Sequence, residues 1–388
     1  MSKSLINNLN ELDENDELEQ ENDELKITRY SFNSFRIERS IRDILSWESR
    51  GKIIIPQFQR EFVWNYKQCC KFIESILLSL PIPDLFMFRE RTSNSETFLL
   101  IDGLQRLSCI KQFVNGTFKC NGEEKKFSIN LKGSEWEGIT YSTLNEEDKN
   151  LFDDYSLKFN IFDSIEDKED IKKLYMQEIF ERINTGSEKL TDQEIRNAVY
   201  NGDIIFKLKE VASNNDFINL VKNTEKFLNH RCYDQELILR FLTYYTITQR
   251  LVENKENIAD QFDFKINSSK KTMLSNYLYC CNKNYIDYKK QIERLYKALN
   301  YLNNFNCNVF NGVNEDKLTN TVNQVFAEAL VIYIMNGGII EISKEELDSK
   351  KILYWKNTSH NENPFYSATT SRNQILKRQD IISCMVKK

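Results

Sequence analysis

The segment FLLIDGLQR, residues 98–106, decides the fold of the first half of this 388-residue chain. Its first four residues are apolar and predict a buried strand. Asp102 ends the strand, and Gly103 supplies a turn. The residues that follow predict a helix whose first turn carries Gln105 and Arg106. A buried strand that turns directly into a helix is typical of a mixed α/β domain.

The same turn has the chemistry of a phosphate site. A helix N-terminus presents free N–H groups and positive partial charge, and Gly103 lets the backbone approach a ligand closely. Arg106 can bind two phosphate oxygens through its planar fork, and Asp102 can hold a magnesium ion that bridges them. In the alternative interpretation, Asp102 only caps the helix and Arg106 forms a surface ion pair.

A second polar cluster lies in IPQFQREFVW, residues 55–64. Here Gln57, Gln59 and Arg60 alternate with aromatic residues, whose rings can exclude water around the polar groups. This arrangement fits the wall of a pocket for a base or a phosphate. The alternative is an irregular loop whose aromatic rings fill the core.

A third cluster lies in FERINTGSEKLTDQEIR, residues 180–196. One helix ends at a turn that contains Asn184, and a second helix begins after it. Arg196 can meet a ligand at this helix entry. Glu194 fits a capping box with Thr191, which explains this glutamate without a ligand.

Glycine and proline divide the chain. Eight of the eleven glycines lie at or before Gly202, and neither residue type occurs from Asp203 to Asn311. Because glycine and proline mark turns and strand ends, we expect an α+β chain. A mixed α/β domain would span residues 26–202, and a mainly α-helical domain would span residues 203–388. The apolar segment Gln235–Tyr245 should lie at the centre of the helical part.

Residues 1–25 form a separate acidic segment with nine acidic residues and one lysine. Such a block stays solvated, so we expect a disordered tail that either solubilises the protein or shields its body from a partner. The other 363 residues carry 49 acidic and 52 basic side chains, a net charge of +3. This charge is compatible with nucleic acid but does not argue for it.

Several classes of protein are excluded by composition. No stretch approaches 18 uncharged apolar residues, and the N-terminus is polar, so we expect neither a membrane span nor a secretory signal. Nine cysteines without a C-x-x-C pair predict reduced thiols in a cytoplasmic protein. The chain lacks a P-loop and a G-x-S-x-G elbow. Its two histidines, His230 and His360, are too few for a two-histidine metal nuclease or a zinc hydrolase.

Taken in order, the motifs resemble those of a known family. IPQFQREFVW (55–64), LPIP (80–83), DGLQR (102–106) and FERINTGSEKLTDQEIR (180–196) are similar to the marks of the N-terminal domain of GmrSD-type modification-dependent restriction enzymes. Leu104 stands where the family's DGQQR signature usually has its first glutamine. The histidine-containing nuclease domain often fused to this family has no recognisable counterpart, so we expect no DNA cleavage by this chain alone.

The resemblance implies a ParB/sulfiredoxin-like α/β domain that binds a nucleoside triphosphate and acts in DNA restriction or phage defence. It places Asp102, Gly103, Gln105 and Arg106 at the phosphate and metal site, with Gln59 and Arg60 alongside. The complete set of candidates consists of catalytic Asp102, Gln105 and Arg106, metal-binding Asp102, and nucleotide-binding Gln57, Gln59, Arg60, Gly103, Asn184 and Arg196.

We therefore expect a Mg²⁺-dependent nucleoside triphosphate hydrolase, in which Asp102 or Gln105 orients the attacking water. Its expected partners are a nucleotide, DNA, a separate nuclease or defence subunit, and a second copy of the chain. Two alternatives stay open. One is a nucleotide-sensing or DNA-binding regulator without turnover, and the other is a DNA-nicking nuclease that uses the same site.

Overall fold

The computed structural model describes residues 32–55, 62, 64–91, 95–120, 123–165, 169–183, 190–224, 227, 231–252, 269–314, 317–359, 362–366 and 372–388. The expected acidic tail, residues 1–25, lies outside these ranges. The contacts divide the chain into two compact units, the first ending at Val199 and the second beginning at Tyr200.

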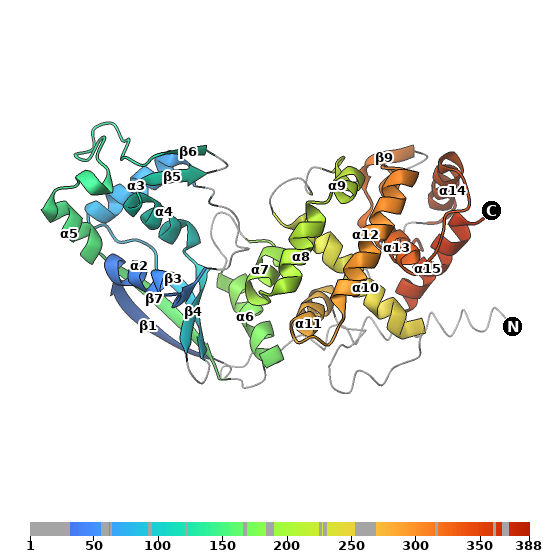
Figure 1. The fold of residues 1–388 in the computed structure, drawn as a ribbon, viewed down its shortest axis with the longest axis horizontal. Helices are drawn as coiled ribbons and strands as arrows, with labels where there is room; N and C mark the ends of the chain where they lie inside the picture. Colours follow the sequence, from blue (N-terminus) through green and yellow to red (C-terminus); the bar gives the residue numbers. More distant parts are fainter. Residues whose placement is uncertain are drawn as a thin grey trace. The chain divides into compact units, whose positions relative to one another are not determined.

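The first unit is built on a five-stranded sheet. Its strands are β1 (Phe32–Ser40), β2 (Ile53–Ile54), β3 (Leu85–Arg91), β4 (Glu96–Asp102) and β7 (Ser156–Ser164). They lie in the order β1-β7-β3-β4-β2. Figure 1 labels β1, β7, β3 and β4 of this sheet. The β1–β7 and β3–β4 pairs are antiparallel, whereas the β7–β3 and β4–β2 pairs are parallel. This mixed sheet confirms the α/β character predicted for the first half.

Four helices share a core with one face of the sheet. They are α2 (Ile41–Ser49), α3 (Tyr66–Leu77), α4 (Leu104–Val114) and α5 (Glu146–Asp154). Met87 and Leu100 from the strands pack in this core with Ile73 and Ile110 from the helices, and all four are fully buried. Side chains alternate between the two faces of a strand, so Phe88 and Leu99 are buried on the other side. Lys172 of α6 (Glu169–Ile183) lies over the Phe88 ring there.

The predicted local signals of the first unit are confirmed where the structure describes them. Strands β5 (Thr117–Cys120) and β6 (Glu123–Lys126) form the predicted hairpin and flank Asn121-Gly122. These two turn residues lie outside the described ranges. The Thr191 N–H donates to Glu194 Oε2 over 2.6 Å, and the Glu194 N–H donates to Thr191 Oγ1 over 3.2 Å. This capping box begins α7 (Asp192–Val199).

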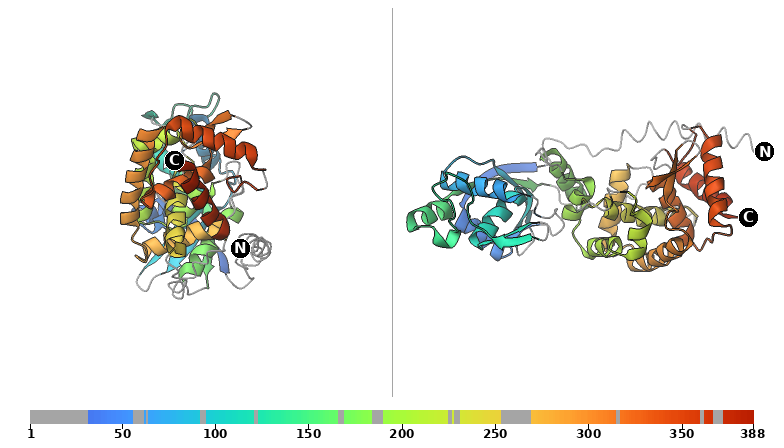
Figure 2. Two further views of the ribbon diagram at one scale, coloured as in Figure 1. Left: turned by 90° about the vertical axis from the view of Figure 1, so that its right-hand side faces the viewer. Right: turned by 90° about the horizontal axis from the view of Figure 1, so that it is seen from above.

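The second unit is mainly helical (Figure 2). Its helices are α8 (Asp203–Ala212), α9 (Asn215–Val221), α10 (Tyr233–Val252), α11 (Lys270–Asn282), α12 (Tyr288–Phe305), α13 (Gln324–Met335), α14 (Lys344–Asn357) and α15 (Arg372–Val386). Helix α10 contacts α8, α11, α12, α13 and α15. Leu237, Ile238, Phe241 and Leu242 of α10 are buried, as predicted for the central helix. Over the described ranges, no helix is long and apolar enough to span a bilayer.

One feature of the second unit was not predicted. Strands β8 (Asn311–Asn314) and β9 (Lys317–Val322) form an antiparallel hairpin between two helices. The segment is rich in asparagine and threonine and lacks the apolar alternation by which a strand is predicted. Tertiary contacts therefore decide its conformation.

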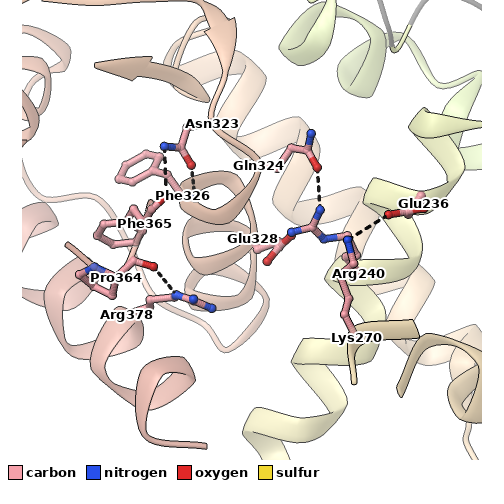
Figure 3. A network of polar contacts seen from close by, with 10 residues as sticks. All are labelled: Glu236, Arg240, Lys270, Asn323, Gln324, Phe326, Glu328, Pro364, Phe365 and Arg378. Atoms are coloured by element: carbon pink, nitrogen blue, oxygen red, sulfur yellow. Dashed lines mark hydrogen bonds and ion pairs between the residues drawn. The ribbon is translucent and has the colours of Figure 1, made fainter. Parts of the chain in front are cut away.

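Buried polar contacts join α10 to α13 and hold α15 to the segment before it (Figure 3). Arg240 forms an ion pair with Glu328, and its Nη1 donates to Gln324 Oε1 over 2.6 Å. Arg378 Nε donates to the carbonyl of Pro364 over 2.9 Å. Burial raises the pKa of Glu328, while the nearby Arg240 and Arg378 lower it.

Lys351 of α14 is a second buried charge in this unit. Its Nζ donates to the carbonyls of Val309 and Asn311 and lies 3.9 Å from the centroid of the Phe326 ring. Burial lowers the pKa of Lys351 to about 7, and Asp348 only partly opposes this shift. The lysine ties α14 to the beginning of the β8–β9 hairpin.

We expect Lys351 to make a contribution to stability that increases with pH. Between pH 7 and 9 the folded state releases the Lys351 proton while the unfolded state, with an ordinary lysine pKa near 10.4, keeps it. Lys351 should therefore add about 2 kcal/mol to the free energy of unfolding over this range, whereas buried thiols such as that of Cys109, whose pKa is raised by burial, act in the opposite direction. Urea unfolding of wild type and Lys351→Met at pH 7, 8 and 9 measures this contribution as the difference between their pH slopes, and Lys350→Met should keep the wild-type slope. Equal pH slopes in wild type and Lys351→Met would contradict the assignment.

Candidate functional site

Residues 98–106 form the predicted strand, turn and helix. Gly103 is the N-cap residue of α4 and has a left-handed backbone, with φ of 109°. A Cβ atom at this position would lie 2.6 Å from Cδ2 of Leu85, so conformation and contact both favour glycine. Asp102 lies directly before this N-cap residue, and its carboxylate pairs with Arg106. Gly103 supplies no side-chain cap, so the first N–H groups of α4 lack a capping oxygen from this position.

Arg106 is held against this turn by three acceptors. Its Nη1 donates to the carbonyls of Pro83 and Asp84, over 2.5 and 3.1 Å, and its Nη2 pairs with the carboxylate of Asp102. The Arg106 side chain is 12% exposed and that of Asp102 is 44% exposed. Arg106 is therefore not a surface residue, although its ion pair with Asp102 is present. Within the described ranges no acceptor contacts Nε, so this edge of the guanidinium can meet a ligand.

Gln105 connects the turn to the second cluster. The Trp64 N–H donates to Gln105 Oε1 over 3.2 Å, and Gln105 is only 9% exposed. The structure therefore brings the end of IPQFQREFVW against the start of α4. Phe62 of the same segment packs edge-to-face on Phe118 of β5, with ring centroids 6.0 Å apart. The candidate residues Gln57, Gln59 and Arg60 lie outside the described ranges.

Three polar residues near the turn were missed in the sequence. Asp84 Oδ2 accepts from Nη2 of Arg36, over 2.8 Å, and from Nδ2 of Asn160, over 3.0 Å. Arg36 lies on β1 and Asn160 on β7, far from Asp84 in the sequence. The only local signal for them is that Asp84 directly follows the LPIP step, residues 80–83.

A β-bulge brings Asp102 to these residues. The β3–β4 register pairs Met87 with Leu100 but Phe86 with Asp102, so β4 holds one extra residue at this point. The next strands pair Phe86 with Asn160. Paired residues present their side chains on the same face of a sheet, and bulges commonly redirect a side chain beside a functional site. The bulge therefore places the Asp102 carboxylate on the face that carries Asn160.

The third cluster is described only in part. Arg196 is buried on α7, and its Nε donates to Gln193 Oε1 on the same helix over 2.8 Å. This bond aligns the guanidinium with its own helix. Asn184 lies outside the described ranges, so a role of either residue at the 102–106 turn stays a prediction.

The residues at the turn fit a magnesium ion that has few protein ligands. In the described part of the chain, no three His, Cys, Asp or Glu side chains come together as a metal cage. Mg²⁺ at phosphate sites commonly takes one or two carboxylates and completes its octahedral shell with phosphate oxygens and water. The half-exposed carboxylate of Asp102 suits such a ligand.

Comparison with known proteins agrees with the motif resemblance. No curated protein matches the chain. Residues 41–201 match the model of the family described as GmrSD restriction endonuclease, N-terminal domain. This range contains the motifs at 55–64, 80–83, 102–106 and 180–196. Residues 41–201 are therefore similar to the GmrSD restriction endonuclease N-terminal domain.

Proposed function

We propose that the first unit binds a nucleoside triphosphate at the 102–106 turn and hydrolyses it with Mg²⁺. The observation that carries this proposal is the geometry of Arg106 at the start of α4. The guanidinium is fixed by Pro83, Asp84 and Asp102, no described residue accepts from its Nε, and the N-cap residue Gly103 supplies no side-chain cap. A fixed guanidinium beside a helix N-terminus, which carries positive partial charge, can form an anion site.

The geometry favours different roles for the two candidate water-orienting residues. Oε1 of Gln105 is occupied by the Trp64 N–H, so Gln105 holds the 55–64 segment against the turn. The Asp102 carboxylate is more exposed and can accept a hydrogen bond from water. Bound Mg²⁺ would be held by Asp102 and would neutralise charge on the phosphate oxygens. Asp102 and Arg106 then make up the catalytic pair, and Gln105 positions the pocket wall.

We place this activity in DNA restriction or phage defence, because the matching family is described as a restriction endonuclease domain. In this proposal nucleotide turnover controls an action on DNA, and a separate nuclease or defence subunit is the partner. A regulator that binds nucleotide without turnover would use the same turn. Phosphate release by the full chain, with and without DNA, separates these two functions.

Replacing Arg106 tests the site. We expect Arg106→Ala to weaken binding of magnesium ATP, GTP or CTP, whichever wild type binds most tightly, by about ten- to hundredfold. The loss corresponds to a charge-assisted contact of about 1.5–3 kcal/mol. Arg106→Lys should restore little, because an ammonium cannot keep the contacts to Pro83, Asp84 and Asp102 and present a further donor to the phosphate. Isothermal titration calorimetry measures the affinities, and circular dichroism shows that the variants fold.

Arg182→Ala is the control, because Arg182 forms an i,i+4 ion pair with Glu178 as Arg106 does with Asp102, but the Arg182 side chain is 68% exposed. It should bind nucleotide as wild type does.

Asp102→Asn should fold normally but lose magnesium-dependent phosphate release. Equal nucleotide affinities of wild type and Arg106→Ala would leave Arg106 with a structural role and refute the proposal.

A further inference from the structure

We propose that Arg36, Asp84 and Asn160 form a positioning network that fixes Arg106 for phosphate binding. This inference rests on the proposed function, since it assigns the residues that hold the phosphate-binding arginine. The three residues lie on different elements: Arg36 on β1, Asn160 on β7, and Asp84 directly before β3. None of them is in the 102–106 turn itself.

The contacts run continuously from the network to Arg106. Arg36 and Asn160 both donate to Oδ2 of Asp84, over 2.8 and 3.0 Å. Arg36 Nε also donates to Oδ1 of Asn160 over 3.4 Å, which closes the triangle. The backbone carbonyl of Asp84 then accepts from Nη1 of Arg106, together with the carbonyl of Pro83. The network therefore holds the backbone that supplies two of the three acceptors of Arg106.

This backbone needs support from side chains. Pro81 and Pro83 have no N–H groups, so the segment before β3 cannot be fixed by donating ladder hydrogen bonds at these positions. At its start, the hydroxyl of Tyr155 donates to the carbonyl of Leu80 over 2.6 Å. At its end, the Asp84 side chain is held by the network. Between these two anchors lie the carbonyls that bind Arg106.

The strand register explains why these residues meet. Arg36 is paired with Asn160 between β1 and β7, and Asn160 is paired with Phe86 between β7 and β3. Phe86 is paired with Asp102 across the bulge. These pairs form one row of residues across the sheet, from Arg36 to Asp102. Asp102 pairs with Arg106 directly, and Arg36 is linked to Arg106 through Asp84. Such a row can set the position of the guanidinium relative to Asp102.

The test compares Asp84→Ala and Asp84→Asn in the full chain. The probes are magnesium ATP and inorganic tripolyphosphate, which isolates the phosphate contacts from those to the base. Asp84→Ala should weaken binding of both probes by roughly five- to tenfold, the effect of one misplaced hydrogen-bonding group. Asp84→Asn keeps an oxygen acceptor for Arg36 and Asn160, so it should stay within about twofold of wild type. If Asp84→Ala does not fold, Asn160→Ala replaces it with the same expectation.

Asp163→Ala is the matched control. Asp163 pairs with Arg89 over 2.5 Å, and the two residues face each other across the same strands, β7 and β3. Both side chains are mostly buried, at 16% and 15% exposure. This variant should lose a comparable cross-strand link and yet bind both probes as wild type does.

A double variant separates positioning from a general loss of structure. In the Arg106→Ala background, Asp84→Ala should weaken binding no further, because the group it positions is gone. Wild-type affinity in Asp84→Ala, or the full extra loss in the double variant, would overturn the positioning role alone. Failure of wild type to bind ATP, GTP, CTP or tripolyphosphate would instead overturn the proposed function.

Discussion

Glu328→Ala is expected to lower the free energy of unfolding by about 3–5 kcal/mol, because it leaves the buried guanidinium of Arg240 without its counter-ion. Arg240 and Glu328 have side-chain exposures of only 6% and 5%. Gln324 is the other described acceptor of Arg240 and carries no charge. Urea unfolding followed by circular dichroism at 222 nm measures the loss.

Replacing both Arg240 and Glu328 should lower the free energy of unfolding far less than replacing Glu328 alone. The pKa of Glu328 is raised by burial in spite of two nearby arginines, which indicates that removing the carboxylate from water is expensive here. An apolar pair of similar volume, Arg240→Met with Glu328→Leu, avoids this desolvation and should recover most of the stability. Glu210→Ala, which breaks the exposed pair with Lys207, should leave stability nearly unchanged. A double variant as unstable as Glu328→Ala would contradict this account.

The fold of the first unit could be predicted to a large extent because its signals are local. The apolar run ending at Asp102 predicts β4, and the Asn121-Gly122 pair predicts the hairpin that flanks it. Thr191 and Glu194 predict the start of α7. Each of these signals lies within a few residues of the element that it predicts. The β8–β9 hairpin has no such signal, because its conformation depends on neighbouring helices.

The candidate site was predictable only where its residues are adjacent in the sequence. Asp102, Gly103 and Arg106 lie within one turn of helix, so their spacing already brings them together. Asp84 and Asn160 are 76 residues apart and meet through the strand order and register. The bulge that redirects Asp102 arises from the pairing of β3 with β4, and a single strand carries no sign of it. Long-range pairing is therefore the information that the motifs lack.

Gly103→Ala should destabilise the protein by about 2–6 kcal/mol and also weaken nucleotide binding. Two separate costs add at this position. A backbone with φ of 109° is strained for any residue with a Cβ atom, at about 1–3 kcal/mol. The new methyl group would also lie 2.6 Å from Cδ2 of Leu85, a fully buried side chain that has little room to move. Overpacking of this kind costs about 1–3 kcal/mol.

Gly116→Ala separates the two costs of Gly103→Ala. Gly116 also has a positive φ, of 72°, but a Cβ atom there would meet nothing within 4 Å. Gly116→Ala should therefore lower stability only through the strain of its positive φ, by about 1–2 kcal/mol. It should leave nucleotide affinity unchanged. Thermal and urea unfolding of both variants give the difference, which is the steric cost at Leu85. Equal losses in the two variants would show that α4 can shift away from β3, and the turn would then not be the rigid frame that the phosphate site requires.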